Sequence, residues 1–205
     1  MVVSSVTTLT AAQQQAAASV LGHAFAKDSF MSYVLPDPTT RIQKLTKLLL
    51  PTIRSGLRQG GVEIAPGGGA LVWVPGQMFS GPSKLIELIR SGVIWLPWSI
   101  GLSACKRRLA HDSVCEYVLK THAQNNFAYL WVVGVHPDHT GQGLGKKLVL
   151  SALDNMRRQG YSTCFLRTEN PGNVGLYEHL GFKQVHTETP ASSGHQYWLM
   201  SQELV

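Results

Sequence analysis

The pattern of apolar and polar positions is clearest in the last third of the chain. Phe127–Val135 is a nearly continuous apolar run, rich in aromatic and β-branched residues and too short for a typical helix. Such a run predicts a strand buried on both faces. After a glycine-containing loop, apolar residues recur at helical spacing over Lys146–Arg158, Gly160 marks the helix end, and Ser162–Arg167 predicts a second short strand. This order predicts a βαβ unit with parallel strands and a right-handed crossover.

The N-terminal segment predicts a strand followed by a helix. We expect Val2–Leu9 to open the sheet, and Thr10 is a good N-cap for a helix over the alanine-rich residues Ala11–Phe25. Two prolines predict a loop over Ser32–Pro38.

A second helix and a hairpin are predicted next. Thr39–Gly56 has a helical pattern, and Pro51 is expected to kink or end that helix. Val62–Ala65 and Ala70–Val74 then predict a β-hairpin around the glycine-rich residues 66–69.

The C-terminal part predicts a turn over Glu169–Asn173, a helix over Val174–Leu180 that Gly181 ends, and a closing hairpin of Phe182–Glu188 and Gln196–Ser201. All these elements together predict an α/β (α+β) fold. We expect a mixed, mostly antiparallel twisted sheet with helices on both faces and a central βαβ unit.

Residues 76–126 show the weakest pattern. A helix is expected over Ser83–Ser91 and a longer one from about Ser99 to His122. Between them, Val93–Trp98 concentrates apolar and aromatic side chains around a proline. This segment could wall a substrate pocket, pack in the core or form a partner interface.

Length and charge set limits on the class of protein. The 205 residues, 44% of them hydrophobic, suffice for one well-buried core, so we expect a single domain over residues 1–205. The formal charge of +6 comes from scattered lysines and arginines without interleaved aromatic residues, so no nucleic-acid partner is expected. The excess of positive charge either belongs to ordinary solvated side chains or serves to bind a polyanionic cofactor.

The cysteine, histidine and hydropathy patterns argue against a disulfide-rich protein, a metal-binding protein and a membrane protein. Cys105, Cys115 and Cys164 are odd in number and have no Cys-x-x-Cys spacing, so they indicate neither a disulfide framework nor a zinc site. His136 and His139 lack a third ligand, and no metal is expected. Since no apolar run reaches about 18 residues and no leader pattern begins the chain, we expect a cytoplasmic protein without a membrane partner.

The loop Thr140–Gly145 places three glycines between the central strand and the next helix. Backbone N–H groups there can approach a ligand without Cβ obstruction, and a helix N-terminus favours phosphate. Lys146 and Lys147 add positive charge. A plain tight turn is the alternative, because glycine motifs alone are weak signals. The loop lacks the Walker pattern, and no ribose-binding acid follows at the dinucleotide spacing.

Two segments carry a family resemblance. The runs VGVHPDHTGQGLGKKL and NPGNVGLYEHLGF resemble the GCN5-related N-acetyltransferase (GNAT) superfamily, and most of all its puromycin acetyltransferase group. The resemblance is strong over residues 127–185, looser over 20–75 and faint over 76–126. Thr140 stands where the family has Gln or Arg, while Gly143 and Gly145 fit the family's loop. The resemblance implies a GNAT-type fold with an acetyl-CoA-binding core at about 127–182 and an acceptor-site region at about 76–126.

The resemblance also implies which residues bind the cosubstrate, acetyl-CoA. The loop residues implied to cradle its pyrophosphate are Gln142, Gly143, Leu144, Gly145 and Lys146. Backbone N–H groups near Val133 and Val135 are implied to bind the acetyl-pantetheine arm and the oxyanion, at the point where the central strand diverges from its parallel neighbour. Asn173 could hold the cofactor through its amide, or it could be a helix N-cap, and the two roles are compatible.

Tyr177 is the candidate general acid. It follows Asn173 by four residues, so both side chains share one helix face, and a phenol can protonate a departing thiolate. Without the surrounding motif, a tyrosine on a short amphipathic helix is more commonly a core residue. The motif position matches the family's catalytic tyrosine.

The general base is not evident from the sequence. Many family members carry a glutamate in the central strand, whereas Tyr129 is the ionisable residue of Phe127–Val135. Glu116, His111 with Asp112, or His122 could approach from the preceding helix, although each is more often a solvated helix residue. A water chain is the alternative.

The sequence leaves several functions open. The primary hypothesis is a metal-independent transfer of acetyl from acetyl-CoA to an amine of a small molecule by direct attack. Acetylation of a peptide or protein amine is the alternative enzyme activity. The non-enzymatic alternative is a coenzyme A-binding sensor that has lost catalysis. The sequence also leaves open whether the protein forms a homodimer.

Overall fold

A computed structural model describes residues 3–66, 68–79, 83–123 and 126–204. Across these residues the strands form one sheet with the order β1-β2-β3-β4-β5-β7-β6. The strands are β1 Ser4–Val6, β2 Gly61–Ala65, β3 Gly69–Pro75, β4 Phe127–Val135, β5 Thr163–Thr168, β6 Lys183–Glu188 and β7 Tyr197–Glu203. The helices are α1 Ala11–Ala24, α2 Ser29–Val34, α3 Pro38–Gln59, α4 Ser83–Ser91, α5 Leu96–Ile100, α6 Leu102–His122, α7 Leu144–Arg158 and α8 Val174–His179.

The sheet is mixed and mostly antiparallel. Strands β4 and β5 pair in parallel, and the other neighbouring strands pair antiparallel. Helix α7 connects the parallel pair, as the βαβ pattern predicts. The predicted fold class is therefore confirmed, whereas the single domain over residues 1–205 stays a prediction.

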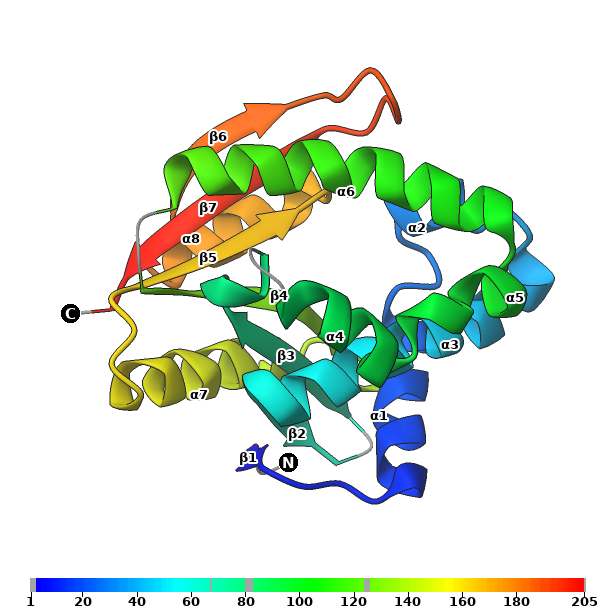
Figure 1. The fold of residues 1–205 in the computed structure, drawn as a ribbon. Coiled ribbons are helices and arrows are strands. Elements are labelled where there is room, and N and C mark those ends of the chain that lie inside the picture. Colours follow the sequence, from blue (N-terminus) through cyan, green and yellow to red (C-terminus); the bar gives the residue numbers. More distant parts are fainter. Residues whose placement is uncertain (1–2, 67, 80–82, 124–125, 205) are drawn as a thin grey trace.

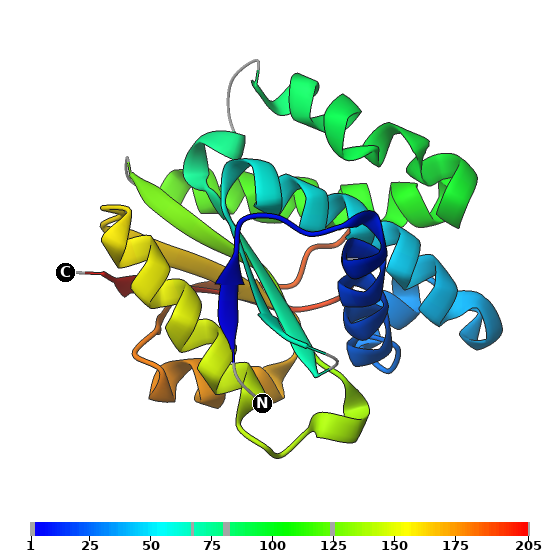
Figure 2. The ribbon, with the colours of Figure 1, turned by 90° about the horizontal axis from the view of Figure 1, so that it is seen from below.

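Helices cover both faces of the sheet (Figures 1 and 2). On one face, α7 and α8 pack on alternate residues of the central strands, including Ala128 and Leu130 of β4. On the other face, α1 and α3 pack near Val132, and α6 packs near Tyr129. Strand β4 is thus covered on both sides, which explains its continuous apolar sequence.

Several predicted elements are confirmed with small changes in their bounds. Thr10 caps α1 in a reciprocal capping box with Gln13, and β2 and β3 form the predicted hairpin. Strand β1 is shorter than the predicted Val2–Leu9, of which the first residue lies outside the described part. Helix α7 begins at Leu144, earlier than predicted, because Gly143 takes the N-cap position with φ 69°.

Two local predictions differ from the structure. Pro51 does not end its helix: α3 continues to Gln59 with Pro51 buried inside it. A proline inside a helix costs about 3 kcal/mol, and here the burial of Leu49 and Ile53 against α1 and the sheet offsets that cost. The predicted loop over Ser32–Pro38 overlaps helix α2, which the Asp28 side chain caps by accepting from the Met31 N–H at 2.8 Å.

Candidate active site

Strands β4 and β5 separate at the carboxyl end of their parallel pairing. The pairing ends at Leu130 and Leu166, although β4 runs on to Val135. On its other side β4 stays paired with β3, where the register shifts so that Trp131 is skipped between Leu130 and Val132. A bulge of this kind bends a strand and often lies beside an active site. The predicted divergence of the central strand from its parallel neighbour is therefore present.

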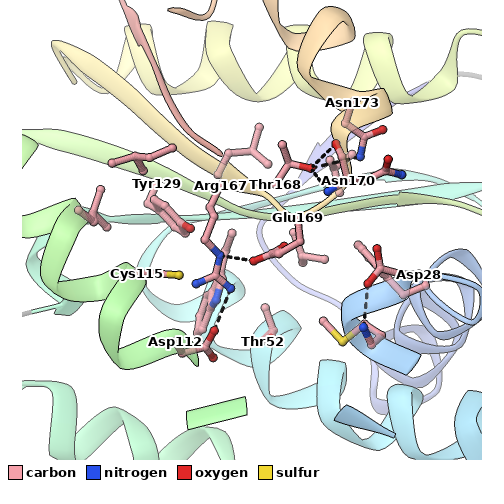
Figure 3. A pocket seen from close by; sticks show the side chains of 18 of the residues that line it. Asp28, Thr52, Asp112, Cys115, Tyr129, Arg167, Thr168, Glu169, Asn170 and Asn173 are labelled. Atoms are coloured by element: carbon pink, nitrogen blue, oxygen red, sulfur yellow. Dashed lines mark hydrogen bonds and ion pairs between the residues drawn. The ribbon is translucent and has the colours of Figure 1, made fainter. Parts of the chain in front are cut away.

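A cavity of about 210 Å³ lies at this divergence (Figure 3). Its walls include β4 residues from Tyr129 to Val133 and the segment from Arg167 to Asn170. Helix α8 contributes to it from one face of the sheet, and α3 and α6 contribute from the other. The cavity therefore joins the two faces of the sheet at the point where the strands separate.

The glycine loop lies at the same edge of the sheet, after the end of β4. Gly141 and Gly143 have φ of 76° and 69°, in the left-handed region that favours glycine. A Cβ added at either position would meet no described atom within 4 Å, so the loop surface is open. No side chain caps the N-terminus of α7, which leaves its first N–H groups available to a ligand.

This geometry fits a pyrophosphate. Gln142 and Lys146 are exposed beside the open N–H groups, whereas Leu144 is buried in the core and can contribute only its backbone. An anion at this position would face the positive end of the 15-residue helix α7. The loop residues do not line the cavity itself, but Val133 does. Val135 lies at the end of β4, and its side chain packs on the face of the sheet that α7 covers.

Tyr177 and Asn173 both line the cavity, as their four-residue spacing predicts. The Tyr177 side chain is only 6% exposed, and its ring packs edge-on against Phe182. The end of α8 is fixed because the Gly181 N–H donates to the Glu178 carbonyl oxygen at 2.9 Å, and the Phe182 N–H donates to that of Tyr177 at 3.0 Å. No described residue hydrogen-bonds the Tyr177 hydroxyl, so it is available to a ligand in the cavity.

Burial raises the pKa of Tyr177, and the negative charge of Glu169 raises it further. The phenol therefore keeps its proton at neutral pH. This is the state that a general acid requires.

Asn173 does not cap α8 with its side chain. Its Nδ2 lies 3.4 Å from Oγ1 of Thr168, and the preceding turn is capped instead by Asn170, whose side chain accepts from the Gly172 N–H at 2.9 Å. Asn173 therefore stands at the predicted N-cap position of α8 but makes no capping hydrogen bond, and its amide lies at the cavity wall.

The four candidate bases lie in different environments. Glu116 and Asp112 line the cavity from α6. Glu116 pairs with Lys120 at 2.8 Å. His122 is exposed, its ring lies tilted against that of His186, and it does not line the cavity. His111 is completely buried, with Nδ1 2.8 Å from Ser193 Oγ and Nε2 3.3 Å from Glu169 Oε1.

A chain of ion pairs crosses the cavity wall. Arg167 places Nε 2.5 Å from Glu169 Oε1 and a terminal nitrogen 2.8 Å from Asp112 Oδ1, while Arg108 Nε lies 3.0 Å from Asp112 Oδ2. Burial alone would raise the pKa of Asp112, but the two guanidinium groups outweigh it and lower the pKa to about 2. Glu169 likewise has a lowered pKa, because Arg167 and His111 outweigh its burial.

The sequence pattern did not identify Asp28, Arg167 and Glu169 as site residues. Glu169 directly follows the carboxyl end of a parallel strand, where ligand sites of α/β sheets commonly lie, so its position was an available signal. Asp28 was identifiable only as a helix cap. Burial raises the pKa of Asp28 and outweighs the hydrogen bond from the Met31 N–H, which lowers it. The nearby charge of Glu169 raises this pKa further.

The aromatic segment Val93–Trp98 does not wall the cavity. Trp95 and Trp98 are 62% and 79% exposed and contact each other with ring centroids 5.6 Å apart. Exposure of this degree also excludes core packing for these two rings. The region's contribution to the cavity comes instead from Phe79 and from one face of α6.

Residues 107–182 match the model of the acetyltransferase (GNAT) family, a range that contains β4, the glycine loop, α7, β5 and α8. This match supports membership of the GNAT superfamily. The fold of the chain is also similar to those of solved acetyltransferases. It aligns with an acetyltransferase from Corynebacterium glutamicum, described as histone acetyltransferase HPA2 and related, with a TM-score of 0.65 and 20% identity over 98% of this chain and 96% of that one. Arylalkylamine N-acetyltransferase 2 from Aedes aegypti aligns with a TM-score of 0.64 and 13% identity over 99% of each chain. At these identities the two structures show the fold alone.

Relatives in sequence match this chain over shorter stretches. A mycothiol acetyltransferase of Saccharomonospora viridis is 39% identical over 67 residues, which are 32% of this chain and 22% of that protein. The [ribosomal protein bS18]-alanine N-acetyltransferase of Escherichia coli is 37% identical over 59 residues, which are 28% of this chain and 40% of that protein. The chain therefore spans less than half the length of either relative. The narrower likeness to the puromycin acetyltransferase group stays a resemblance.

Two further observations concern metal and membrane. In the described ranges, no three His, Cys, Asp or Glu side chains are grouped so that they could hold a metal ion. None of the helices in those ranges combines the length and apolar character that crossing a bilayer requires.

Proposed function

We propose that this GNAT protein transfers the acetyl group of acetyl-CoA to an amine of a small molecule by direct attack. The observation that carries the proposal is the Tyr177 hydroxyl at the divergence of β4 and β5, which is buried, has a raised pKa because of that burial, and makes no hydrogen bond to any described residue. The family match over residues 107–182 supports the same chemistry.

Each part of the site has a role in this proposal. The N–H groups of residues 143–146 bind the pyrophosphate, and Asn173 holds the pantetheine arm with its amide. Backbone N–H groups of β4 near Val133 and Val135, beyond the last residue paired with β5, donate to the carbonyl oxygen as it gains negative charge. When bound, acetyl-CoA supplies an activated acetyl thioester.

In the proposed reaction, Tyr177 carries out one proton transfer, to the departing sulfur. The neutral amine nitrogen forms a bond to the carbonyl carbon, the carbon–sulfur bond breaks, and the Tyr177 hydroxyl donates its proton to the sulfur. The proton lost by the attacking nitrogen leaves through water or through a carboxylate of the cavity wall. Glu116 and Glu169 are the candidates for that carboxylate, because both line the cavity.

The test is acetylation of a broad amine panel with isotope-labelled acetyl-CoA. We expect labelled product from at least one small amine and a loss of product in Tyr177→Phe. Binding of acetyl-CoA without acetylation of any amine would instead support the coenzyme A-binding sensor.

A second candidate is acetylation of a peptide or protein amine. The relative named as a ribosomal-protein alanine N-acetyltransferase favours keeping it. Peptides with free N-termini belong in the same panel, and a preference for them of tenfold or more in kcat/KM would replace the small-molecule assignment. The cytoplasm as compartment and a homodimer as assembly stay predictions.

A further inference from the structure

The charged residues of the cavity wall are mostly negative. Four carboxylates and two guanidinium groups line the cavity: Asp28, Asp112, Glu116, Glu169, Arg108 and Arg167. The carboxylates come from three places: Asp28 caps α2, Asp112 and Glu116 lie on α6, and Glu169 follows β5. Figure 3 shows Asp28, Asp112 and Glu169 around the same cavity.

The two guanidinium groups compensate only part of this charge. Arg108 pairs with Asp112, and Arg167 bridges Asp112 and Glu169. None of the ion pairs between described residues includes Asp28. Its Oδ1 accepts from the Met31 N–H at 2.8 Å, and the Phe30 N–H and the His195 imidazole also act on this carboxyl. Asp28 is half-buried at the wall of the cavity that Glu169 also lines, and burial together with the negative charge of Glu169 raises the pKa of Asp28.

The cavity also offers polar groups that lack protein partners. Tyr129 and Tyr177 are 7% and 6% exposed, and both line the cavity. Their hydroxyls make no hydrogen bond to any described residue. Buried polar groups normally have partners, so these two hydroxyls indicate a site built to receive a polar ligand.

The excess of negative charge in the cavity, together with the chemistry of the transfer, limits which amines can be good acceptors. The attacking nitrogen must be neutral, so it cannot compensate Asp28 at the moment of attack. An uncompensated carboxylate in a partly buried site is costly, and a cationic group that pairs with it there is favoured over one in water. A monoamine would leave Asp28 unpaired, whereas a second cationic group on the acceptor would pair with it.

We propose that the acceptor is an amine that carries a second cationic group, and that Asp28 binds this group with Glu169 beside it. The inference rests on the proposed function and specifies its substrate class. Glu169 contributes Oε2, because the contacts from Arg167 and His111 are both to Oε1. Asp28 is a specificity residue in this proposal, and Tyr177 remains the acid.

The experiment compares two probes of equal length, 1,4-diaminobutane and butan-1-amine, as acceptors with acetyl-CoA. We expect kcat/KM for the diamine to exceed that for the monoamine at least tenfold. In Asp28→Asn the ratio of the two values should fall by tenfold or more. Asparagine is a good N-cap, so this variant keeps the cap of α2 and removes only the charge.

Asp37→Asn is the matched control. Asp37 caps α3 in the same way as Asp28 caps α2, accepting from the Thr39 N–H at 3.0 Å, and it does not line the cavity. We expect the ratio to stay unchanged in this variant. Equal kcat/KM for the two probes, or an equal loss for both in Asp28→Asn, would overturn the inference while the acetyltransferase function stands.

Calorimetry separates this inference from the proposed function. If no amine of the panel is acetylated, the proposed function fails, and binding of 1,4-diaminobutane to the wild-type protein and to Asp28→Asn decides the inference alone. Binding that weakens at least fivefold in Asp28→Asn supports a dication site. Binding that is absent, or equal in both proteins, overturns it.

Discussion

The Ser151 hydroxyl of α7 donates to Oε2 of Glu63 on β2 at 2.6 Å. Asn155, one turn further along α7, donates to Oε1 of the same carboxylate at 3.3 Å. Glu63 is completely buried, so these contacts satisfy a charged group that would otherwise be costly. They also fix the position on the sheet of the helix whose N-terminus carries the glycine loop.

Glu63→Ala should lower the free energy of unfolding by about 1–3 kcal/mol, because it removes the acceptor of the Ser151 hydroxyl and one of the two acceptors of the Asn155 amide. Urea unfolding of Glu63→Ala, Ser151→Ala and the double variant measures the coupling. We expect an interaction energy of at least about 0.5 kcal/mol. Additive effects in the double variant would show that the contact contributes nothing to stability.

Gly143→Val should weaken acetyl-CoA binding at least tenfold. Valine is strained at φ 69°, at a cost of about 1–3 kcal/mol, and relief of that strain moves the loop N–H groups away from the pyrophosphate. Calorimetry with acetyl-CoA measures the effect. Gly160→Val is the control at the other end of α7, where φ is 82° and an added Cβ also meets no described atom within 4 Å. Equal affinities in the two variants would remove the loop from the cofactor site.

Tyr177→Phe should bind acetyl-CoA normally but turn over at least tenfold more slowly, since the ring still packs on Phe182 while the proton donor is lost. The loss should be smaller with an acetyl donor whose thiolate leaves without protonation. The control Tyr161→Phe changes a tyrosine that packs edge-on against Trp73 and does not line the cavity. Equal losses with both donors would assign Tyr177 a positioning role.

Asp112 should make stability depend on pH in acid. Its pKa falls from 3.8 to about 2 because Arg167 and Arg108 outweigh its burial. A lowered pKa in the folded state stabilises the protein above the unfolded value, and that stabilisation is lost as pH falls from about 4 toward 2. Asp112→Asn should therefore reduce the free energy of unfolding more at pH 6 than at pH 2.

Urea unfolding at the two pH values tests the Asp112 prediction. Asp138→Asn is the comparison variant, because the Asp138 side chain is 81% exposed. Its effect should be small at both pH values. An Asp112→Asn effect that is the same at pH 6 and pH 2 would contradict the prediction.

The elements at the centre of the fold could be predicted because their signals are local. The apolar run of β4 has the bounds Phe127–Val135 predicted for it, and α4 and the capping of α1 were also predicted. Tyr177 and Asn173 reach one cavity because a four-residue spacing on a helix fixes their shared face. Glycine spacing likewise located the open N-terminus of α7.

Other features depended on contacts between segments far apart in the chain. Pro51 stays inside α3 because packing against α1 and the sheet outweighs the local cost, and no window around Pro51 contains that packing. Asp28, Asp112 and Glu169 come from α2, α6 and the end of β5, and they meet only where the bulge in β4 separates it from β5. Sequence determined the side of the site proposed for the cosubstrate, because its groups are backbone N–H donors and neighbours on one helix. Only the tertiary structure decided the side proposed for the acceptor, because its charges and their pairing arise from three segments packed together.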